Sequence, residues 1–208
     1  MLKLFYAPGS CALASHIALE ESGAPYEAER VDLGGGQQRS PAYLKLNPKG
    51  RVPALATDRG VISENPAILA YVAQSFPQAK LAPLDDPFAF ARIQAFNGYL
   101  SATLHVAHAH GRRGTRWVDE TETGAIEAMK RKVPQSVGDC FDLVEREMFA
   151  GPWAMGADYT IADPYLFTVA GWIEGDGLDP KRFPKILDHR NRMAERPAVR
   201  KVMEREGR

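Results

Sequence analysis

The strongest constraint on the fold is a change in the hydrophobic pattern of the chain near residue 80. Before that point, short apolar runs typical of strands alternate with segments whose apolar residues recur at helical spacing. The predicted strands lie at 2–6, 26–31, 52–57 and 61–62, and the predicted helices at 10–22, 40–46 and 65–74. The resulting order, β-α-β-α-β-β-α, indicates a small α/β domain over residues 1–80.

The rest of the chain carries only helical patterns. Residues 81–87 read L-A-P-L-D-D-P, which is typical of a linker. The predicted helices that follow lie at 88–110, 120–148, 160–175, 183–195 and 198–204. Pro134 is expected to interrupt the second of these, because proline lacks the N–H that a helix interior needs. Residues 88–208 are therefore predicted to form an all-helical domain.

Charge and cysteine content exclude several functional classes. The 208 residues contain 26 basic and 26 acidic side chains, which argues against binding to nucleic acid or a membrane surface. Arg112, Arg113 and Arg116 nevertheless lie close enough in sequence to form a local basic patch. Two cysteines and no secretory signal indicate a reducing compartment, and no apolar run approaches the roughly 20 residues of a membrane span. We therefore expect a cytoplasmic protein.

A cysteine at the start of the first predicted helix is the main candidate for chemistry. Residues 5–13 read F-Y-A-P-G-S-C-A-L, so that Cys11 follows the Pro-Gly turn directly. Free N–H groups and the helix dipole favour a thiolate at such a position, and the Ser10 hydroxyl is expected to contribute. His16 lies about 140° around this helix from Cys11, and it is predicted to pack in the core rather than act as a base.

Two further segments suggest contacts to an extended ligand. Residues 47–55 read N-P-K-G-R-V-P-A-L, and a cis bond before Pro53 would leave the backbone of Val52 free to pair with a peptide. An ordinary trans proline at the strand entry is the alternative that this segment alone favours. In the segment S-E-N-P at 63–66, Asn65 is a predicted N-cap and Glu64 could accept a hydrogen bond from an ammonium group. A plain helix start with a solvated Glu64 is the interpretation that this segment alone favours.

These motifs, together with T-I-A-D-P-Y-L-F at 160–167, resemble those of the glutathione S-transferases. The run F-Y-A-P-G-S-C-A-L-A-S-H-I-A-L at 5–19 is most similar to the bacterial beta class. The resemblance implies a thioredoxin-like N-terminal domain, an all-helical C-terminal domain and a homodimer. It also implies that the protein transfers glutathione to hydrophobic electrophiles and uses no metal.

The resemblance also implies roles for individual residues. Val52, before a cis Pro53, would pair with the cysteinyl part of glutathione, while Glu64 and Asn65 would hold its γ-glutamyl end. Cys11 would lie beside the ligand sulfur, and His105 would reach the site from the long helix. The full set of predicted glutathione-binding residues is Cys11, Arg51, Val52, Pro53, Glu64, Asn65 and His105, with Cys11 and His105 also predicted to be catalytic. Tyr6 and Ser10 are expected to support this set from outside it.

The remaining polar motifs are interpreted as structural. His105 and His108 share a helix face, but no carboxylate or cysteine lies nearby in sequence to complete a metal site. His108 and His110 are therefore expected to be solvated or structural, and Cys140 to pack in the core. Thr160 and Asp163 have the spacing of a capping box, which we assign to folding of the helical domain.

The chain departs from the beta-class pattern where that class carries lysines. The loop after the second strand reads Gly34-Gly35-Gly36, with Gln37, Gln38 and Arg39 as possible substitutes, and the residue after His105 is Val106. The missing charges predict weaker glutathione affinity or a preference for a modified thiol. The electrophile is expected between the two domains, against apolar residues of the helix at 88–111. Two alternatives stay open: a thiol-disulfide oxidoreductase that uses Cys11 as a single thiol, and a ligand-binding protein without turnover.

Overall fold

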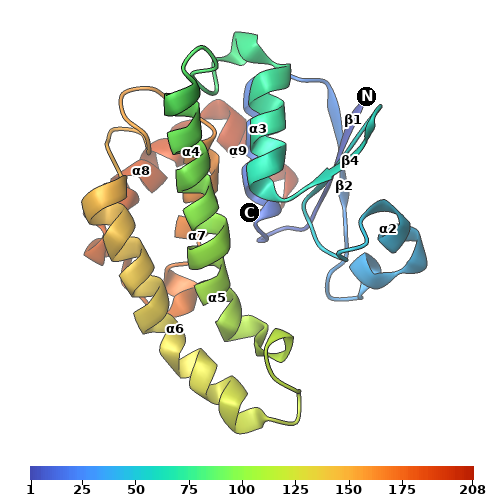
Figure 1. The fold of residues 1–208 in the computed structure, drawn as a ribbon, viewed down its shortest axis with the longest axis vertical. Helices are drawn as coiled ribbons and strands as arrows, with labels where there is room; N and C mark the ends of the chain where they lie inside the picture. Colours follow the sequence, from blue (N-terminus) through green and yellow to red (C-terminus); the bar gives the residue numbers. More distant parts are fainter.

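The computed structural model describes residues 1–208 and has nine α-helices and a four-stranded sheet (Figure 1). The strands are β1 Leu2–Tyr6, β2 Tyr26–Arg30, β3 Ala54–Thr57 and β4 Gly60–Ser63. The helices are α1 Ala12–Ser22, α2 Pro41–Leu46, α3 Asn65–Ser75, α4 Pro87–Tyr99, α5 His105–Arg112, α6 Thr123–Leu143, α7 Ala162–Ala170, α8 Pro184–Glu195 and α9 Pro197–Arg205. The predicted order β-α-β-α-β-β-α followed by helices is confirmed.

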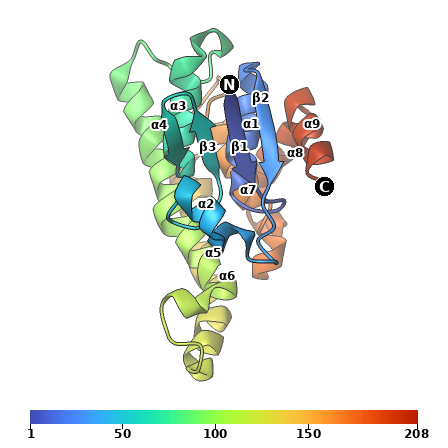
Figure 2. The same ribbon diagram turned by 90° about the vertical axis from the view of Figure 1, so that its right-hand side faces the viewer.

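The sheet has the strand order β2-β1-β3-β4 and is mixed. β1 runs parallel to β2 and antiparallel to β3, and β3 pairs with β4 through a tight turn. Leu4 of β1 lies opposite Leu55 of β3, and both are fully buried on the face that the helices cover. Figure 2 shows α2 in front of the sheet and α1 behind it, which is the layered arrangement of a thioredoxin-like domain.

A continuous core joins the sheet to the helical part of the chain. α1 packs against α3 on one side and against α7 on the other, and every residue of α7 is buried. Leu4 and Leu55 from the sheet belong to the same buried cluster as Tyr165 and Leu166 from α7. The two parts are therefore held in a fixed relation by apolar packing, which keeps any cavity between them well defined.

The long helix predicted at 88–110 contains a register change. α4 runs into a π-helical turn, Leu100–Leu104, and α5 continues directly from it. A π-helical turn adds one residue to a turn of helix and is often found beside functional sites. Here it immediately precedes His105, so it sets the direction in which the side chains of α5 point.

Two details of the helical prediction were wrong. Pro134 does not interrupt the helix that contains it but lies inside α6, where Val133, Val137 and Phe141 are buried and hold both sides of the proline in place. The helix predicted at 160–175 ends earlier, because α7 stops at Ala170 and a short 3₁₀ turn, Glu174–Asp176, follows. No helix combines the length and the apolar character that crossing a membrane requires.

The capping box at the start of α7 is confirmed. The carboxylate of Asp163 accepts a hydrogen bond from the backbone N–H of Thr160 at 2.6 Å. It also accepts from the N–H of Ala154 at 2.7 Å and bonds Nε2 of His189 at 2.9 Å. Because Asp163 and His189 are fully buried, this network ties α7 to α8 and to the preceding loop.

Candidate active site

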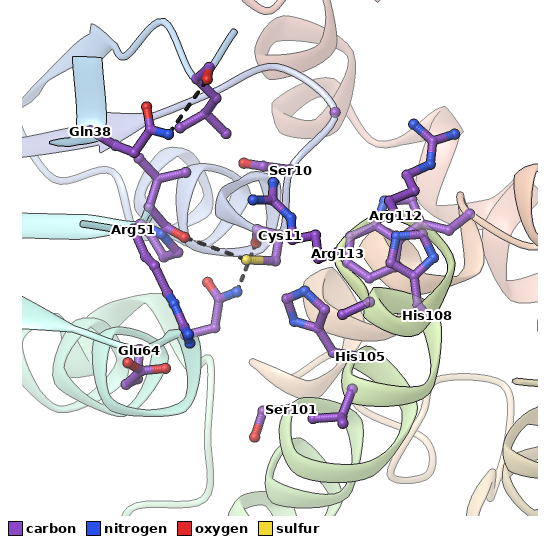
Figure 3. Close-up of a pocket in the computed structure, with 18 of the residues that line it drawn as sticks. Ser10, Cys11, Gln38, Arg51, Glu64, Ser101, His105, His108, Arg112 and Arg113 are labelled. Carbon is purple, nitrogen blue, oxygen red and sulfur yellow. Dashed lines mark hydrogen bonds between the residues drawn. The ribbon is translucent and has the colours of Figure 1, made fainter. Parts of the chain in front are cut away.

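A cavity of about 700 Å³ lies where the start of α1, the segment before β3, the start of α3 and the face of α5 meet (Figure 3). This volume falls within the range of about 300–1,000 Å³ that is typical of small-molecule sites. The cavity is lined by Ser10, Cys11, Arg51, Val52, Pro53, Glu64, Asn65 and His105. Of the residues predicted to form or support the site, Tyr6 alone lies outside the lining; it is buried against His16.

Cys11 lies at the point where three elements converge. It is the residue that precedes α1, and its Sγ donates a hydrogen bond to the carbonyl oxygen of Val52 at 3.6 Å. The side-chain amide of Asn65 donates to the carbonyl of Cys11 at 2.8 Å. The start of α1 is therefore fixed against both the segment before β3 and the start of α3.

The predicted thiolate at Cys11 was wrong. Burial raises the pKa of the Cys11 thiol to about 12, and the Glu64 carboxylate adds to this effect, while Arg113 opposes it. The Ser10 hydroxyl is turned to the backbone, donating to the carbonyl of Ala7 at 2.7 Å and accepting from the N–H of Ala12 at 3.2 Å. Loss of solvation outweighs the helix N-terminus, so Cys11 is an S–H donor at neutral pH.

The backbone before β3 has the shape that an added strand would need. The Val52–Pro53 peptide bond is cis, as the family resemblance implied. The carbonyl of Arg51 accepts hydrogen bonds from the Tyr43 hydroxyl at 2.8 Å and from the buried amide of Asn47 at 2.7 Å. These bonds hold Arg51 from behind and leave Val52 at the edge of the cavity.

The start of α3 differs from the prediction. Glu64, not Asn65, is the cap residue, with a left-handed φ of 76° that few non-glycine residues adopt. Its exposed carboxylate accepts a hydrogen bond from Nζ of Lys49 at 2.7 Å. Asn65 is buried, and its side-chain oxygen accepts from the Ser15 hydroxyl at 2.6 Å. Asn65 therefore positions Cys11, whereas Glu64 faces the cavity.

The histidines of α5 take different positions. Burial, helped by neighbouring cationic groups, lowers the pKa of the half-buried His105 to about 4, so His105 is neutral at pH 7. Nδ1 of His108 lies 2.8 Å from the Asp176 carboxylate, and its ring stacks on Trp172 at 4.3 Å. His110 stacks on Trp117. The structure contains no group of three or more histidine, cysteine or acidic side chains arranged to hold a metal ion.

Comparisons with known proteins identify the family. Residues 1–74 match the family described as "Glutathione S-transferase, N-terminal domain". The chain is 35% identical to glutathione S-transferase GstA of Escherichia coli O157:H7, over 99% of each protein. The chain belongs to the glutathione S-transferase family.

Solved structures of transferases agree with this assignment. A glutathione transferase homologue from Sulfitobacter with bound glutathione is 42% identical, with a TM-score of 0.94 over 99% of this chain and 98% of that one. A bacterial beta-class glutathione S-transferase from Sphingomonas chungbukensis is 34% identical, with a TM-score of 0.85 over 99% and 98% of the two chains. The thioredoxin-like fold and the transferase family are thus established together.

Four arginines make the cavity of this transferase strongly cationic, and of these the sequence analysis connected only Arg51 with the site. Arg51, Arg112, Arg113 and Arg116 all line the cavity, and none of them forms an ion pair or donates a side-chain hydrogen bond within the protein. These arginines add positive charge to a cavity that lacks the beta-class lysines, which weakens the electrostatic basis of the prediction of weaker glutathione binding. Among the substitutes considered in the loop, only Gln38 lines the cavity.

The helix spacing held a signal for these arginines. Arg112 follows His105 by seven residues, so both lie on one face of α5. The expected apolar surface for the electrophile is present only in part on this face. Ser101, His105 and Arg112 line the cavity there beside the apolar Val106 and Ala109, and Trp117, Tyr165 and Trp172 add aromatic surface from neighbouring segments.

Proposed function

We propose that this transferase conjugates glutathione to small electrophiles in the cavity, with the sulfur of glutathione beside Cys11. One observation carries the proposal: the Cys11 thiol and the Val52 carbonyl meet at 3.6 Å at the wall of the cavity. A cysteinyl residue that pairs with the backbone of Val52 would have its own sulfur next to that thiol. The Sulfitobacter homologue described with bound glutathione supports glutathione as the thiol substrate.

The rest of the tripeptide matches the charges around Cys11. The ammonium group of the γ-glutamyl part would bind the Glu64 carboxylate, in competition with Lys49. The neighbouring carboxylate would accept a hydrogen bond from the backbone N–H of Asn65 at the start of α3, because Pro66 has no N–H and that of Ala67 bonds the carbonyl of Glu64. At the other end, Arg51 is available for the glycine carboxylate. Val52 lies between these two groups in the chain.

Conjugation requires the thiolate of glutathione, and Cys11 is suited to stabilise it. Because the Cys11 thiol keeps its proton at neutral pH, it can donate a hydrogen bond to the sulfur of glutathione instead of to Val52. A hydrogen bond donated to the thiolate of glutathione stabilises it and so lowers the pKa of the glutathione thiol. Arg113 adds positive charge nearby, and the neutral His105 ring can supply a further hydrogen bond.

Different observations weigh against the two alternative functions. As a thiol-disulfide oxidoreductase, Cys11 would need to be the nucleophile, but a pKa of about 12 leaves a thiolate fraction on the order of 10⁻⁵ at pH 7. A ligand-binding protein without turnover was suggested by the missing lysines, and the cavity arginines supply that charge. Conjugation is therefore the function that the cavity supports best.

We also propose that the protein works as a cytoplasmic homodimer. Both cysteines are free, which suits a reducing compartment. Phe88 on α4 is 75% exposed and Val61 on β4 is 43% exposed. An interface that joins the helical part of one subunit to the N-terminal part of the other would cover both of these exposed apolar side chains. Light scattering combined with size-exclusion chromatography measures the mass directly.

A turnover assay tests the proposed function. Glutathione and 1-chloro-2,4-dinitrobenzene are mixed with wild-type protein, and the absorbance of the conjugate is followed from pH 6 to pH 8. Cys11→Ala is expected to lower kcat/KM at pH 6.5 by roughly tenfold, because one charge-assisted hydrogen bond to the thiolate is lost. Cys140→Ala, which removes the other thiol, is expected to behave as wild type. Wild-type protein that conjugates neither this compound nor a broad panel of electrophiles would contradict the proposal.

A further inference from the structure

The cationic groups of the cavity lie on two sides of Cys11. Figure 3 shows Arg51 and Glu64 on one side of the Cys11 sulfur and Arg112 and His108 on the other. The glutathione position proposed above uses the first side, together with Arg113 near the sulfur. The second side is then available for the other substrate, and the groups that line it indicate the chemical class of that substrate.

Arg112 on that second side has no partner in the protein. Its guanidinium lies beside Gly175, with Nη2 3.8 Å from the place that a Cβ on this glycine would take. The acidic residues that flank Gly175 are both engaged elsewhere: Glu174 pairs with Arg190 at 2.6 Å, and Asp176 with His108 at 2.8 Å. Arg112 is thus free to bind an anion, although two carboxylates flank the glycine that lies beside it.

The surface next to Arg112 suits a flat apolar group. Trp172 lines the cavity, and its ring packs at 4.3 Å against His108 and at 5.0 Å against His105. Two glycines, Gly171 and Gly175, border the same region and place no side chain in it. An aromatic side chain and an unpaired guanidinium in the wall of one cavity can hold a planar group at one end and an anionic group at the other.

A count of charges separates this subsite from the glutathione site. Glutathione has two carboxylates, for which the start of α3 and Arg51 are available, and one thiolate beside Cys11 and Arg113. Burial and the nearby Arg51 and Arg113 lower the pKa of Arg116, which places Arg116 with the glutathione side. Arg112 is therefore left without a group of glutathione to bind. We infer that the second substrate is an electrophile that carries a carboxylate, bound by Arg112 and packed against Trp172. This inference rests on the proposed function and names the class of the second substrate.

The chemistry can be written for a chloroarene carboxylate. The sulfur of glutathione forms a bond to the carbon that carries chlorine, the carbon–chlorine bond breaks, and chloride leaves with its electron pair. The proton of the thiol passes to solvent. Arg112 takes no part in these bond changes. Its role is to hold the carboxylate so that the reacting carbon faces the sulfur.

A matched pair of electrophiles tests the inference. 4-Chloro-3,5-dinitrobenzoate carries the carboxylate, and the corresponding benzamide is its neutral analogue of similar size. The measured quantity is the ratio of kcat/KM for benzoate to that for benzamide, each divided by its uncatalysed rate. Wild-type protein is expected to favour the benzoate, and Arg112→Gln to lower this ratio by roughly tenfold, mainly through the KM of the benzoate.

Two control variants distinguish a specific role from general damage. Arg112→Lys keeps the positive charge and is expected to keep most of the selectivity, while Arg59→Gln removes an exposed charge from the β3–β4 turn and is expected to change neither rate. A folded Arg112→Gln protein with an unchanged ratio would overturn the inference. If wild-type protein conjugates neither compound and also none of the broad panel of electrophiles, the proposed function has failed. Calorimetry of benzoate binding to the glutathione-loaded protein then decides the subsite separately: binding lost in Arg112→Gln supports it, and binding kept overturns it.

Discussion

Alkylation of Cys11 by iodoacetamide is expected to be slow at neutral pH. Only the thiolate reacts, and burial holds the pKa of this thiol at about 12, against about 8.5 for an unperturbed cysteine. At pH 7 the difference lowers the thiolate fraction by about 3,000-fold. A thiolate of higher pKa is a better nucleophile, which returns a factor of about 40 with a Brønsted coefficient near 0.45. Cys11 should therefore react about 80-fold more slowly than an exposed cysteine.

Peptide mass spectrometry after timed labelling measures this rate and separates Cys11 from Cys140. The same protein unfolded in denaturant supplies the reference rate for both cysteines. In the folded protein, the rate at Cys11 is expected to rise about tenfold for each pH step from 7 to 10, without a plateau. A plateau with a midpoint at or below pH 8.5 would refute the reasoning. It would show that the helix N-terminus outweighs burial, and it would restore the thiol-disulfide hypothesis.

Three further predictions concern stability and pH. Asp163→Ala leaves three buried donors without a partner and should lower the free energy of unfolding by about 4 kcal/mol, measured by urea denaturation; a loss below about 1 kcal/mol would contradict the network. Because the Cys11 thiol holds its proton more tightly when folded, wild type should lose about 2 kcal/mol more stability than Cys11→Ala between pH 7 and pH 10. Equal losses would argue against the raised pKa. His105→Gln should lower kcat without changing the shape of its pH profile from 5.5 to 8, since His105 is already neutral there. Loss of a step near pH 6.5 would show otherwise.

The order of strands and helices could be predicted because it depends on local patterns. The spacing of apolar residues in 10–22 and 65–74 is enough to define α1 and α3. The motifs around Cys11, Val52 and Glu64 predicted that these residues lie together, and all three line one cavity. This was possible because a family resemblance implies a three-dimensional arrangement, which residue spacing alone does not. Pro134 was misjudged because the packing of both halves of α6 outweighs one missing hydrogen bond.

The electrostatic state of the site could not be predicted from local sequence. The pKa of Cys11 depends on how deeply the segments around Val52 and Glu64 bury it, and these lie more than 40 residues away. The sequence predicts Asn65 as a helix cap, but its side chain accepts a hydrogen bond from Ser15, 50 residues earlier. Arg112 at the end of α5, with Arg113 and Arg116 just after it, was noticed as a patch but not as part of the site. Their position relative to His105 requires knowing which helix face points inward.

The π-helical turn at Leu100–Leu104 determines which side chains of α5 line the cavity. Because a helix rotates by about 100° per residue, deleting a single residue from that turn would carry His105 and Arg112 together toward a different neighbour. The sheet, α1 and Cys11 would stay in place. Relatives that differ by one residue at this point would then keep the same position for the thiol while presenting an entirely different surface to the second substrate.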